Sequence, residues 1–334
     1  MQKNFWQFWQ VIGVALALLV GGTNSARAQG SDVSGVMEPV RVVATFSILA
    51  DMVREVGGEQ IILTTIVGRN GDAHSFEPTP RDARALGQAQ MLVRNGLGFE
   101  GWLPRLVEAS GFSGLDVVAS TGVQALRLDE VPSDEGSHAE HAHEADDHAD
   151  HGAGHHHDGD LDPHAWQDLS NGAVYVRNIA KGLAQIDPGH AEQYRQRAQA
   201  YIERLMAEDR AVRDQLAAIP AARRVMMTSH DAFGYFGHAY GIRLISIVGI
   251  SSEAEPTARI IASLIDQIRA EHIHALFLEN AANPKLMQRI AQETGVRVGG
   301  MLYADALDAS EREAGSYLGM FRWNMQQLLA AFKD

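Results

Sequence analysis

The sequence predicts an α/β protein with two parallel-sheet lobes, joined by one long rigid helix, and a metal site in the cleft between the lobes. Three observations carry this prediction. Short apolar, β-branched runs alternate with helical patterns in both halves of the chain. A long, largely polar helical stretch separates the halves. Histidines and an aspartate follow predicted strands, where open α/β sheets bind their ligands.

The first lobe, residues 38–188, alternates buried strands with helices. Strands are expected at 41–46, 60–67, 91–94 and 115–120, and helices at 47–56, 80–88, 99–110 and 171–186. Gly57 and Gly58 end the first helix, and Thr79 followed by Pro80 begins the second. Strands that alternate with helices in this way pair in parallel.

The linking helix, residues 189–219, starts after Asp187-Pro188 and ends at Pro220. Charged residues surround most of it, as expected of a helix that bridges two domains. The second lobe, residues 220–334, repeats the rhythm of the first. Its strands are expected at 225–228, 244–250, 275–278 and 296–302, and its helices at 231–240, 256–271, 284–294 and 315–332.

The N-terminus predicts export. Lys3, an apolar run over 11–20 and the site Ala26-Arg27-Ala28 are typical of a signal peptide, residues 1–28. The apolar run is too short to span a membrane. The chain contains no cysteine, which excludes disulfides, thiolate ligands and a lipid-modified cysteine. We therefore expect a secreted protein of the periplasm that is not lipid-anchored.

The net charge narrows the choice of partners. The chain has 28 basic and 42 acidic residues, a formal charge of −14. This balance argues against nucleic acid and anionic membranes as partners and suits a protein that binds cations.

A histidine-rich, acidic segment, residues 133–160, interrupts the first lobe. It has almost no apolar side chains, which predicts a disordered loop. Neutral imidazoles bind metals, so the segment is expected to act as an accessory metal loop, with a solvated linker as the alternative. Its histidines are His138, His141, His143, His148, His151, His155, His156 and His157.

Four candidate metal ligands lie at predicted strand ends or a helix entry: His74, His164, His230 and Asp305. Taken alone, each of these residues could equally be a hydrogen-bonded residue or a helix cap. Together, at strand ends and a helix entry, they predict a metal site. Three imidazoles and one carboxylate favour Zn²⁺ over Mn²⁺, and four protein donors indicate capture rather than catalysis. The histidines without this placement, expected to be structural, are His190, His238, His272 and His274.

Six motifs of the chain carry a family resemblance: Asp72–Pro80, Asn95–Glu100, Asp162–Trp166, Ser229–Phe236, Phe277–Asn280 and Leu302–Leu307. Through them the chain resembles the substrate-binding proteins of zinc/manganese ABC importers over essentially its whole mature length. The resemblance implies two lobes on a rigid helix and assigns the ligands to His74, His164, His230 and Asp305. It also implies a monomer that works with a membrane permease, and a periplasmic metallochaperone as a further candidate partner.

Departures within the family bear on the metal. Manganese members resemble Ser-Glu-Gly where this chain has Ser229-His230-Asp231, so His230 and the histidine-rich insertion favour zinc. Some zinc-specific relatives have a cysteine pair that this chain lacks, which leaves Mn²⁺ or mixed uptake as an alternative. Metal-bound imidazoles donate their second N–H to a polar group. Candidates for that role are Glu77, Asn95 and Glu279.

Other functions compete with import. A periplasmic zinc buffer or chaperone would need the same site and no transporter. A zinc hydrolase is disfavoured because the sequence has no H-E-x-x-H motif, and we expect no enzymatic activity. Binding of haem or a metal chelate is disfavoured by the three converging histidines.

Overall fold

The structure is a computed structural model that describes residues 38–128, 161–246, 258–270, 273, 275–280 and 283–333. The expected signal peptide, residues 1–28, and the accessory metal loop, residues 133–160, lie outside the described residues. Within the described ranges, no helix has both the length and the apolar character needed to cross a membrane.

The first lobe is a four-stranded parallel sheet with the strand order β2-β1-β3-β4. Its strands are β1 (Val40–Phe46), β2 (Ile61–Val67), β3 (Met91–Arg94) and β4 (Leu115–Val118). Its helices are α1 (Ser47–Gly57), α2 (Pro80–Gly87), α3 (Leu103–Ser110) and α4 (Leu169–Ile186). α1 and α4 pack against each other and α2 packs against α3.

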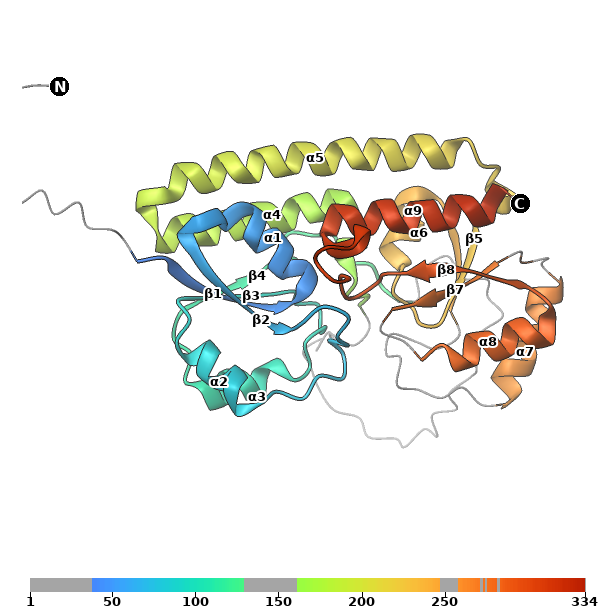
Figure 1. Cartoon of the computed structure of the whole chain (residues 1–334), viewed down its shortest axis with the longest axis horizontal. Helices are drawn as coiled ribbons and strands as arrows, with labels where there is room; N and C mark the ends of the chain where they lie inside the picture. The colour runs from blue at the N-terminus through green and yellow to red at the C-terminus, as the bar shows by residue number, and fades with distance from the viewer. Residues whose placement is uncertain are drawn as a thin grey trace, which may run out of the picture. The chain divides into compact units, whose positions relative to one another are not determined.

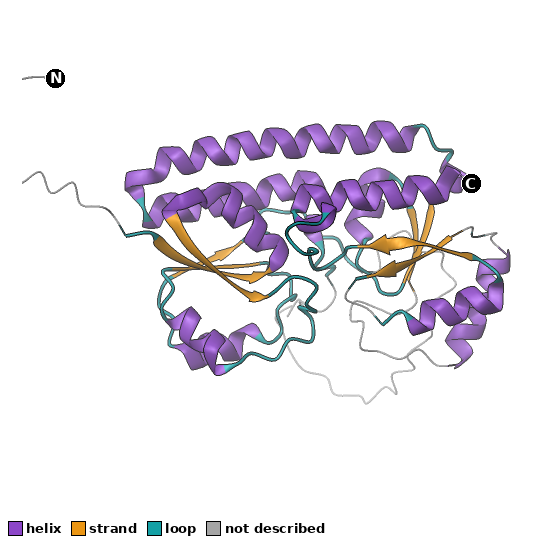
Figure 2. Cartoon of the chain, in the orientation of Figure 1, coloured by secondary structure: helices purple, strands orange, loops and turns teal. Residues whose placement is uncertain are grey.

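The second lobe is also a four-stranded parallel sheet, with the order β6-β5-β7-β8. Its strands are β5 (Val225–Thr228), β6 (Arg243–Ser246), β7 (Ala275–Glu279) and β8 (Arg297–Leu302). Its helices are α6 (Gly234–Tyr240), α7 (Ala258–Ala270), α8 (Lys285–Thr294) and α9 (Tyr317–Lys333). Figure 2 shows the two sheets as separate groups of strands.

The linking helix α5 (Ala191–Ala217) is 27 residues long and follows a single 3-10 turn, Pro188–His190. At 1.5 Å per residue it extends about 40 Å. It contacts α1 and α4 of the first lobe and α6 and α9 of the second (Figure 1). The sequence suggested a helix that is polar most of the way round. It also has a buried stripe, which consists of Tyr194, Ala198, Tyr201, Ile202, Leu205, Val212 and Leu216.

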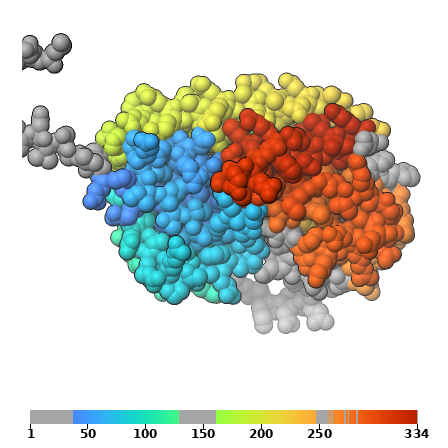
Figure 3. Space-filling view, viewed as in Figure 1, coloured from blue at the N-terminus to red at the C-terminus, as the bar shows by residue number. Residues whose placement is uncertain are grey.

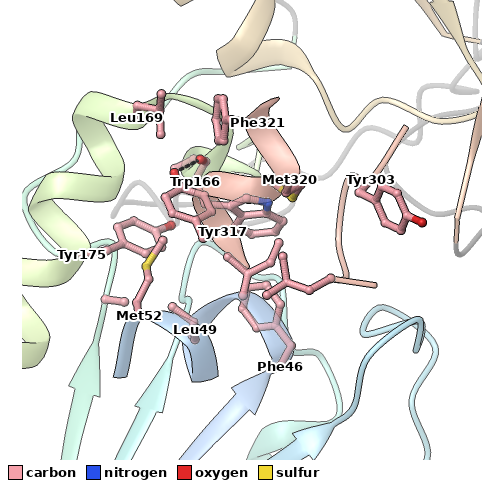
Figure 4. Close-up of a cluster of buried hydrophobic side chains, with 14 of the residues drawn as sticks. Phe46, Leu49, Met52, Trp166, Leu169, Tyr175, Tyr303, Tyr317, Met320 and Phe321 are labelled. Carbon is pink, nitrogen blue, oxygen red and sulfur yellow. Dashed lines mark hydrogen bonds between the residues drawn. The ribbon is translucent and has the colours of Figure 1, made fainter. Parts of the chain in front are cut away.

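The main hydrophobic core continues from one lobe into the other. Trp166 packs its ring 5.0 Å from Phe46, between centroids, and its carbonyl accepts a hydrogen bond from the Tyr317 hydroxyl (Figure 4). All three side chains are almost fully buried. A smaller cluster, which includes Met227, Ile268 and others, fills the space between the second sheet and α7 and α8. The lobes therefore share one core beneath the linking helix.

The predicted fold class is confirmed, and most element bounds agree within two or three residues. The predicted helix that is capped by Thr79 and begins at Pro80 is confirmed. The Asp82 carboxylate accepts a hydrogen bond from the Thr79 backbone N–H at 2.8 Å, as in a capping box. The predicted helix 99–110 begins only at Leu103. The preceding turn has positive φ at Gly96, Leu97 and Gly98, which a helix does not allow.

Candidate metal centre

The four candidate ligands lie in connections that follow strands. His74 lies between β2 and α2, and His164 immediately before the 3-10 turn Ala165–Gln167. His230 follows β5, and Asp305 follows β8. Each offers one donor atom, and these four atoms lie within 4.8 Å of one another. Among the described residues this is the one such group of histidines and acids.

The separations within the group suit a single metal ion. Nε2 of His74 lies 3.2 Å from Nε2 of His164 and 3.6 Å from Oδ2 of Asp305. Nε2 of His230 lies 3.0 Å from Oδ2 of Asp305. A tetrahedral ion with donors at about 2.0–2.1 Å separates them by about 3.3–3.4 Å. The donor atoms therefore stand close to the spacing that such an ion needs.

The candidate ligands are buried, and their charges act strongly on one another's pKa values. His164 is 0% exposed, and His230 and Asp305 are each 3% exposed. Burial lowers the pKa of His230, but Glu279 and Asp305 outweigh it, and the pKa is raised well above its usual value. Burial raises the pKa of Asp305, but His230 and His164 outweigh it, and the pKa is lowered well below its usual value. The same carboxylates that favour a cationic imidazole would also stabilise a divalent cation.

His164 is held through a carboxylate two residues before it. Oδ1 of Asp162 accepts from the His164 backbone N–H at 2.9 Å and lies 2.8 Å from its Nδ1. Asn95 donates to the Pro163 carbonyl at 2.8 Å and accepts from the Tyr175 hydroxyl. These contacts fix the ring so that Nε2 faces the other donors, which is the usual arrangement of a metal-binding histidine.

His230 is held by a carboxylate from the neighbouring strand. Nδ1 of His230 lies 2.6 Å from Oε2 of Glu279, at the end of β7. Oε1 of Glu279 accepts from the backbone N–H groups of Ser229 and His230 at 2.7 and 3.1 Å. One carboxylate therefore fixes both the backbone and the ring of His230.

His74 is held mainly through its backbone and through a ring contact. Its N–H donates to Oδ1 of Asp72 at 2.8 Å, and Trp102 donates to the Ala73 carbonyl at 2.8 Å. The imidazole packs edge-on against Phe99, 4.6 Å between centroids. Its side chain is 10% exposed, so it is the most accessible of the four.

The structure brings some candidate supporting residues to the site and leaves others away from it. Asn95 and Glu279 lie against the segments that carry His164 and His230. Glu77 lies in the same loop as His74, but its side chain is exposed. His190 instead lies 2.7 Å from Asp187 at the start of α5. Of the other histidines expected to be structural, His238 is exposed on α6, and His272 and His274 lie outside the described residues.

Asp162 is a supporting residue that was not among the candidates predicted from the sequence. The signal was present as the spacing Asp-x-His, which leads into two of the candidate ligands, at Asp72-Ala-His74 and at Asp162-Pro-His164. In both places Oδ1 of the aspartate accepts the backbone N–H of the histidine. A short acidic side chain two residues earlier commonly makes this bond.

Comparison with known proteins identifies the family. A family model described as zinc-uptake complex component A, periplasmic (ZnuA), matches residues 42–331. The chain belongs to this family, whose members are the metal-binding substrate-binding proteins of ABC transporters.

Individual relatives are named for several metals. The manganese-binding lipoprotein MntA of Halalkalibacterium halodurans is 32% identical, covering 96% of this chain and 97% of its own. The iron-binding protein YfeA of Yersinia pestis is 29% identical, covering 96% and 94%. The solved periplasmic zinc-binding protein TroA of Treponema pallidum is 27% identical, with a TM-score of 0.75, covering 88% and 99%.

These names overturn the expectation of a protein without a lipid anchor. Several relatives are named as lipoproteins, including the Halalkalibacterium halodurans protein and the substrate-binding lipoprotein ScbA of Streptococcus cristatus. The expectation was wrong because it took the absence of cysteine as a guide to location. A missing thiol limits one attachment chemistry and does not show that a protein diffuses freely.

Proposed function

We propose that the protein captures Zn²⁺ outside the cytoplasmic membrane and delivers it to the membrane permease of an ABC importer. The observation that carries the proposal is the buried group formed by His74, His164, His230 and Asp305. In this proposal these four side chains are the metal ligands, and Zn²⁺ is the transported substrate.

The donor set favours zinc. Three imidazole nitrogens with one carboxylate form a nitrogen-rich set, which suits Zn²⁺ better than the oxygen-preferring Mn²⁺. With all four tetrahedral positions filled by protein atoms, little room remains for an activated water, so the site favours binding over hydrolysis. Membership in a transport family supports the same choice.

Manganese, alone or together with zinc, is the second candidate. Two observations favour it. Relatives such as the lipoprotein PsaA of Streptococcus pneumoniae are named for manganese. The second observation is the orientation of Asp305. Oδ2 of Asp305 lies 3.0 Å from His230 and Oδ1 lies 3.5 Å from His164, so both oxygens face the histidines. A carboxylate that binds through both oxygens would raise the share of oxygen donors, which suits manganese.

Competitive titration distinguishes the two metals. Metal-stripped protein is titrated with Zn²⁺ and with Mn²⁺ against a chelator of known affinity, beside the His230→Glu variant. We expect wild type to bind zinc at least tenfold more tightly, a difference of about 1.4 kcal/mol. The variant should narrow that ratio. Equal or tighter manganese binding by wild type would assign the import substrate to manganese.

A transport role is tested separately from binding. A deletion strain should lose growth at scarce zinc, and recover it with the wild-type protein but not with the Asp305→Ala variant. Growth of the deletion strain equal to its parent would favour the zinc buffer or chaperone function. The histidine-rich loop, residues 133–160, enters the proposal as a weaker collector that raises the metal concentration near the site by tethering.

A further inference from the structure

The segment that carries Asp305 is bound by the first lobe, although it follows the last strand of the second sheet. On one side of Asp305, the Ala304 carbonyl accepts from Trp166 Nε1 at 2.9 Å and Gln167 Nε2 at 2.8 Å. On the other side, the Leu307 N–H donates to Ser47 Oγ at 3.0 Å. Backbone groups on both sides of Asp305 are therefore positioned by first-lobe side chains.

Two residues that precede His74 add a further connection to the same segment. Arg69 Nη1 donates to the backbone carbonyls of Asp308 and Gly315, the latter at 2.7 Å. Asn70 donates its backbone N–H to the Leu307 carbonyl at 3.0 Å and its amide to Oδ1 of Asp308 at 3.2 Å. We call Arg69 and Asn70 the latch. Figure 3 shows the segment after β8, in red, packed against the blue first lobe.

The backbone conformation of Asn70 and a contact from Asn280 support the latch. Asn70 has a φ of 55°, in the left-handed region that residues other than glycine seldom adopt. Asn is among the residues that tolerate this conformation best. Asn280, which follows β7, donates to Asn70 Oδ1 at 3.1 Å and to the Ala306 carbonyl at 3.3 Å. The side chains of Arg69 and Asn280 and the backbone N–H of Asn70 thus donate to the carbonyls of the three residues 306–308, which follow Asp305.

The position of the latch relates it to the candidate metal centre. Asn70 lies four residues before His74, and its acceptors Leu307 and Asp308 lie two and three residues after Asp305. His74 and Asp305 come from different lobes, and their donor atoms are 3.6 Å apart. Short connections from a hydrogen-bonded point restrict both side chains more than attachment to separate lobes would.

We propose that Arg69 and Asn70 are positioning residues that hold His74 and Asp305 together and so set how long a metal ion stays bound. This inference rests on the proposed function of the site. A metal ion leaves when the loop after β2 separates from the segment after β8, and this separation requires the latch to open. The latch therefore acts on release more than on capture.

The test is the release rate of the full-length, metal-loaded protein. Zn²⁺-loaded protein is mixed with excess chromophoric chelator, and release is followed in a stopped-flow instrument. Arg69→Met should release zinc about 10- to 100-fold faster, the range found when groups that orient metal ligands are removed. The association rate should change much less. Arg69→Lys, which keeps the charge and one donor group, should fall between wild type and Arg69→Met.

Arg197 offers a matched control. Its guanidinium also donates to two backbone carbonyls, those of Val56 and Gly57 at 2.6 and 2.9 Å, but these lie at the end of α1. Arg197→Met loses the same charge and the same kind of contact, and it should lower thermal stability without faster zinc release. Asn70→Gly keeps the backbone bond and tolerates the positive φ, so its release should speed up less than that of Arg69→Met.

The outcomes separate the latch from the site. Release from Arg69→Met at the wild-type rate, or equal acceleration in Arg69→Met and Arg197→Met, would overturn the latch. If Arg69→Met does not fold, the zinc release rates of Arg69→Lys and Asn70→Gly are compared with those of wild type and Arg197→Met instead. Release at the wild-type rate from both variants would overturn the latch. In Co²⁺-loaded protein, the absorption bands should be unchanged in Arg69→Met because the ligands are the same. Failure of wild type to retain Zn²⁺, Co²⁺ or Mn²⁺ would reject the metal function itself.

Discussion

The two lobes share one strand order, but only one of the two site residues in each lobe follows the same strand as its counterpart. In the orders β2-β1-β3-β4 and β6-β5-β7-β8, β4 corresponds to β8, and β1 to β5. His164 and Asp305 lie in the connections after the corresponding strands β4 and β8. His74 follows the edge strand β2, whereas His230 follows the inner strand β5. The shared topology brings these connections to one edge of each sheet, and the loop sequences determine which connection supplies a donor.

The supporting asparagines are more alike than the donors. Asn95 follows β3 directly, and Asn280 follows the corresponding strand β7. Asn95 donates to the carbonyl of Pro163, the residue before His164. Asn280 donates to the carbonyl of Ala306, the residue after Asp305. In each lobe an amide at the end of the third strand therefore binds the backbone beside a candidate ligand.

The largest expected effect is the loss of one donor from either lobe. A zinc site with a binding free energy of about 10–16 kcal/mol gains on average about 2.5–4 kcal/mol from each of four donors. His164→Ala and His230→Ala should each therefore weaken zinc binding by a factor of about 10²–10³. Chelator competition measures both. Wild-type affinity in either variant would remove that histidine from the ligand set and leave the other lobe to account for binding.

A smaller effect should follow from removing the carboxylates that hold the two buried histidines. Asp162→Asn in the first lobe and Glu279→Gln in the second should each weaken zinc binding about 10- to 100-fold. Glu77→Gln makes the same kind of change on an exposed side chain, and its effect should stay within about 0.5 kcal/mol. If Asp162→Asn binds zinc as tightly as wild type while Glu279→Gln binds it more weakly, only the histidine of the second lobe needs a supporting carboxylate.

Much of the fold was predictable because its signals are local. Buried parallel strands appear as short apolar runs, and helix starts appear as Thr79-Pro80 or Asp187-Pro188. The alternation of strand and helix then fixes a parallel sheet in each half. That His74, His164, His230 and Asp305 lie close together was predictable from the same signals, since each follows a strand or a loop that leads into a helix.

The remaining features depend on contacts between residues that are distant in sequence. Arg69 binds carbonyls more than two hundred residues away, and a carbonyl acceptor leaves no trace in the sequence. The same holds for Trp166, whose indole binds the Ala304 carbonyl. The shared core beneath α5 was not predicted because most residues of that helix are polar. The few apolar residues that form its buried stripe, at helical spacing, are a weak signal among them.

Deletion of residues 133–160 should leave the tight site almost unchanged. The loop contributes none of the four candidate ligands, so the tight-site dissociation constant should change by less than about twofold, under about 0.4 kcal/mol. Weaker zinc binding should disappear, and capture at scarce zinc should slow. Calorimetric titration of both proteins measures the number and strength of the sites. A large loss of tight-site affinity would make the loop part of the first lobe's contribution to the centre.

The last expected effect is a small change in stability, without a change in metal ligands, at Asp308, where the two lobes meet. The Tyr303 hydroxyl donates to its carboxylate at 2.7 Å, and this bond lowers the pKa of Asp308 below its usual value against the opposing effect of partial burial. A lowered folded-state pKa stabilises the protein above the unfolded value of about 3.9. That stabilisation is lost as the pH falls through the folded value.

Asp308→Asn should therefore lower the melting temperature of the metal-free protein by about 1–3 °C at pH 7. The deficit should be constant down to about pH 5 and shrink as acid protonates Asp308 in wild type. Thermal unfolding across this pH range measures it. Asp116→Asn is the control, because Asp116 forms a surface ion pair with Arg94, and such pairs contribute little. A deficit that stays the same at pH 3 would mean that shape, and not charge, joins the lobes at this point.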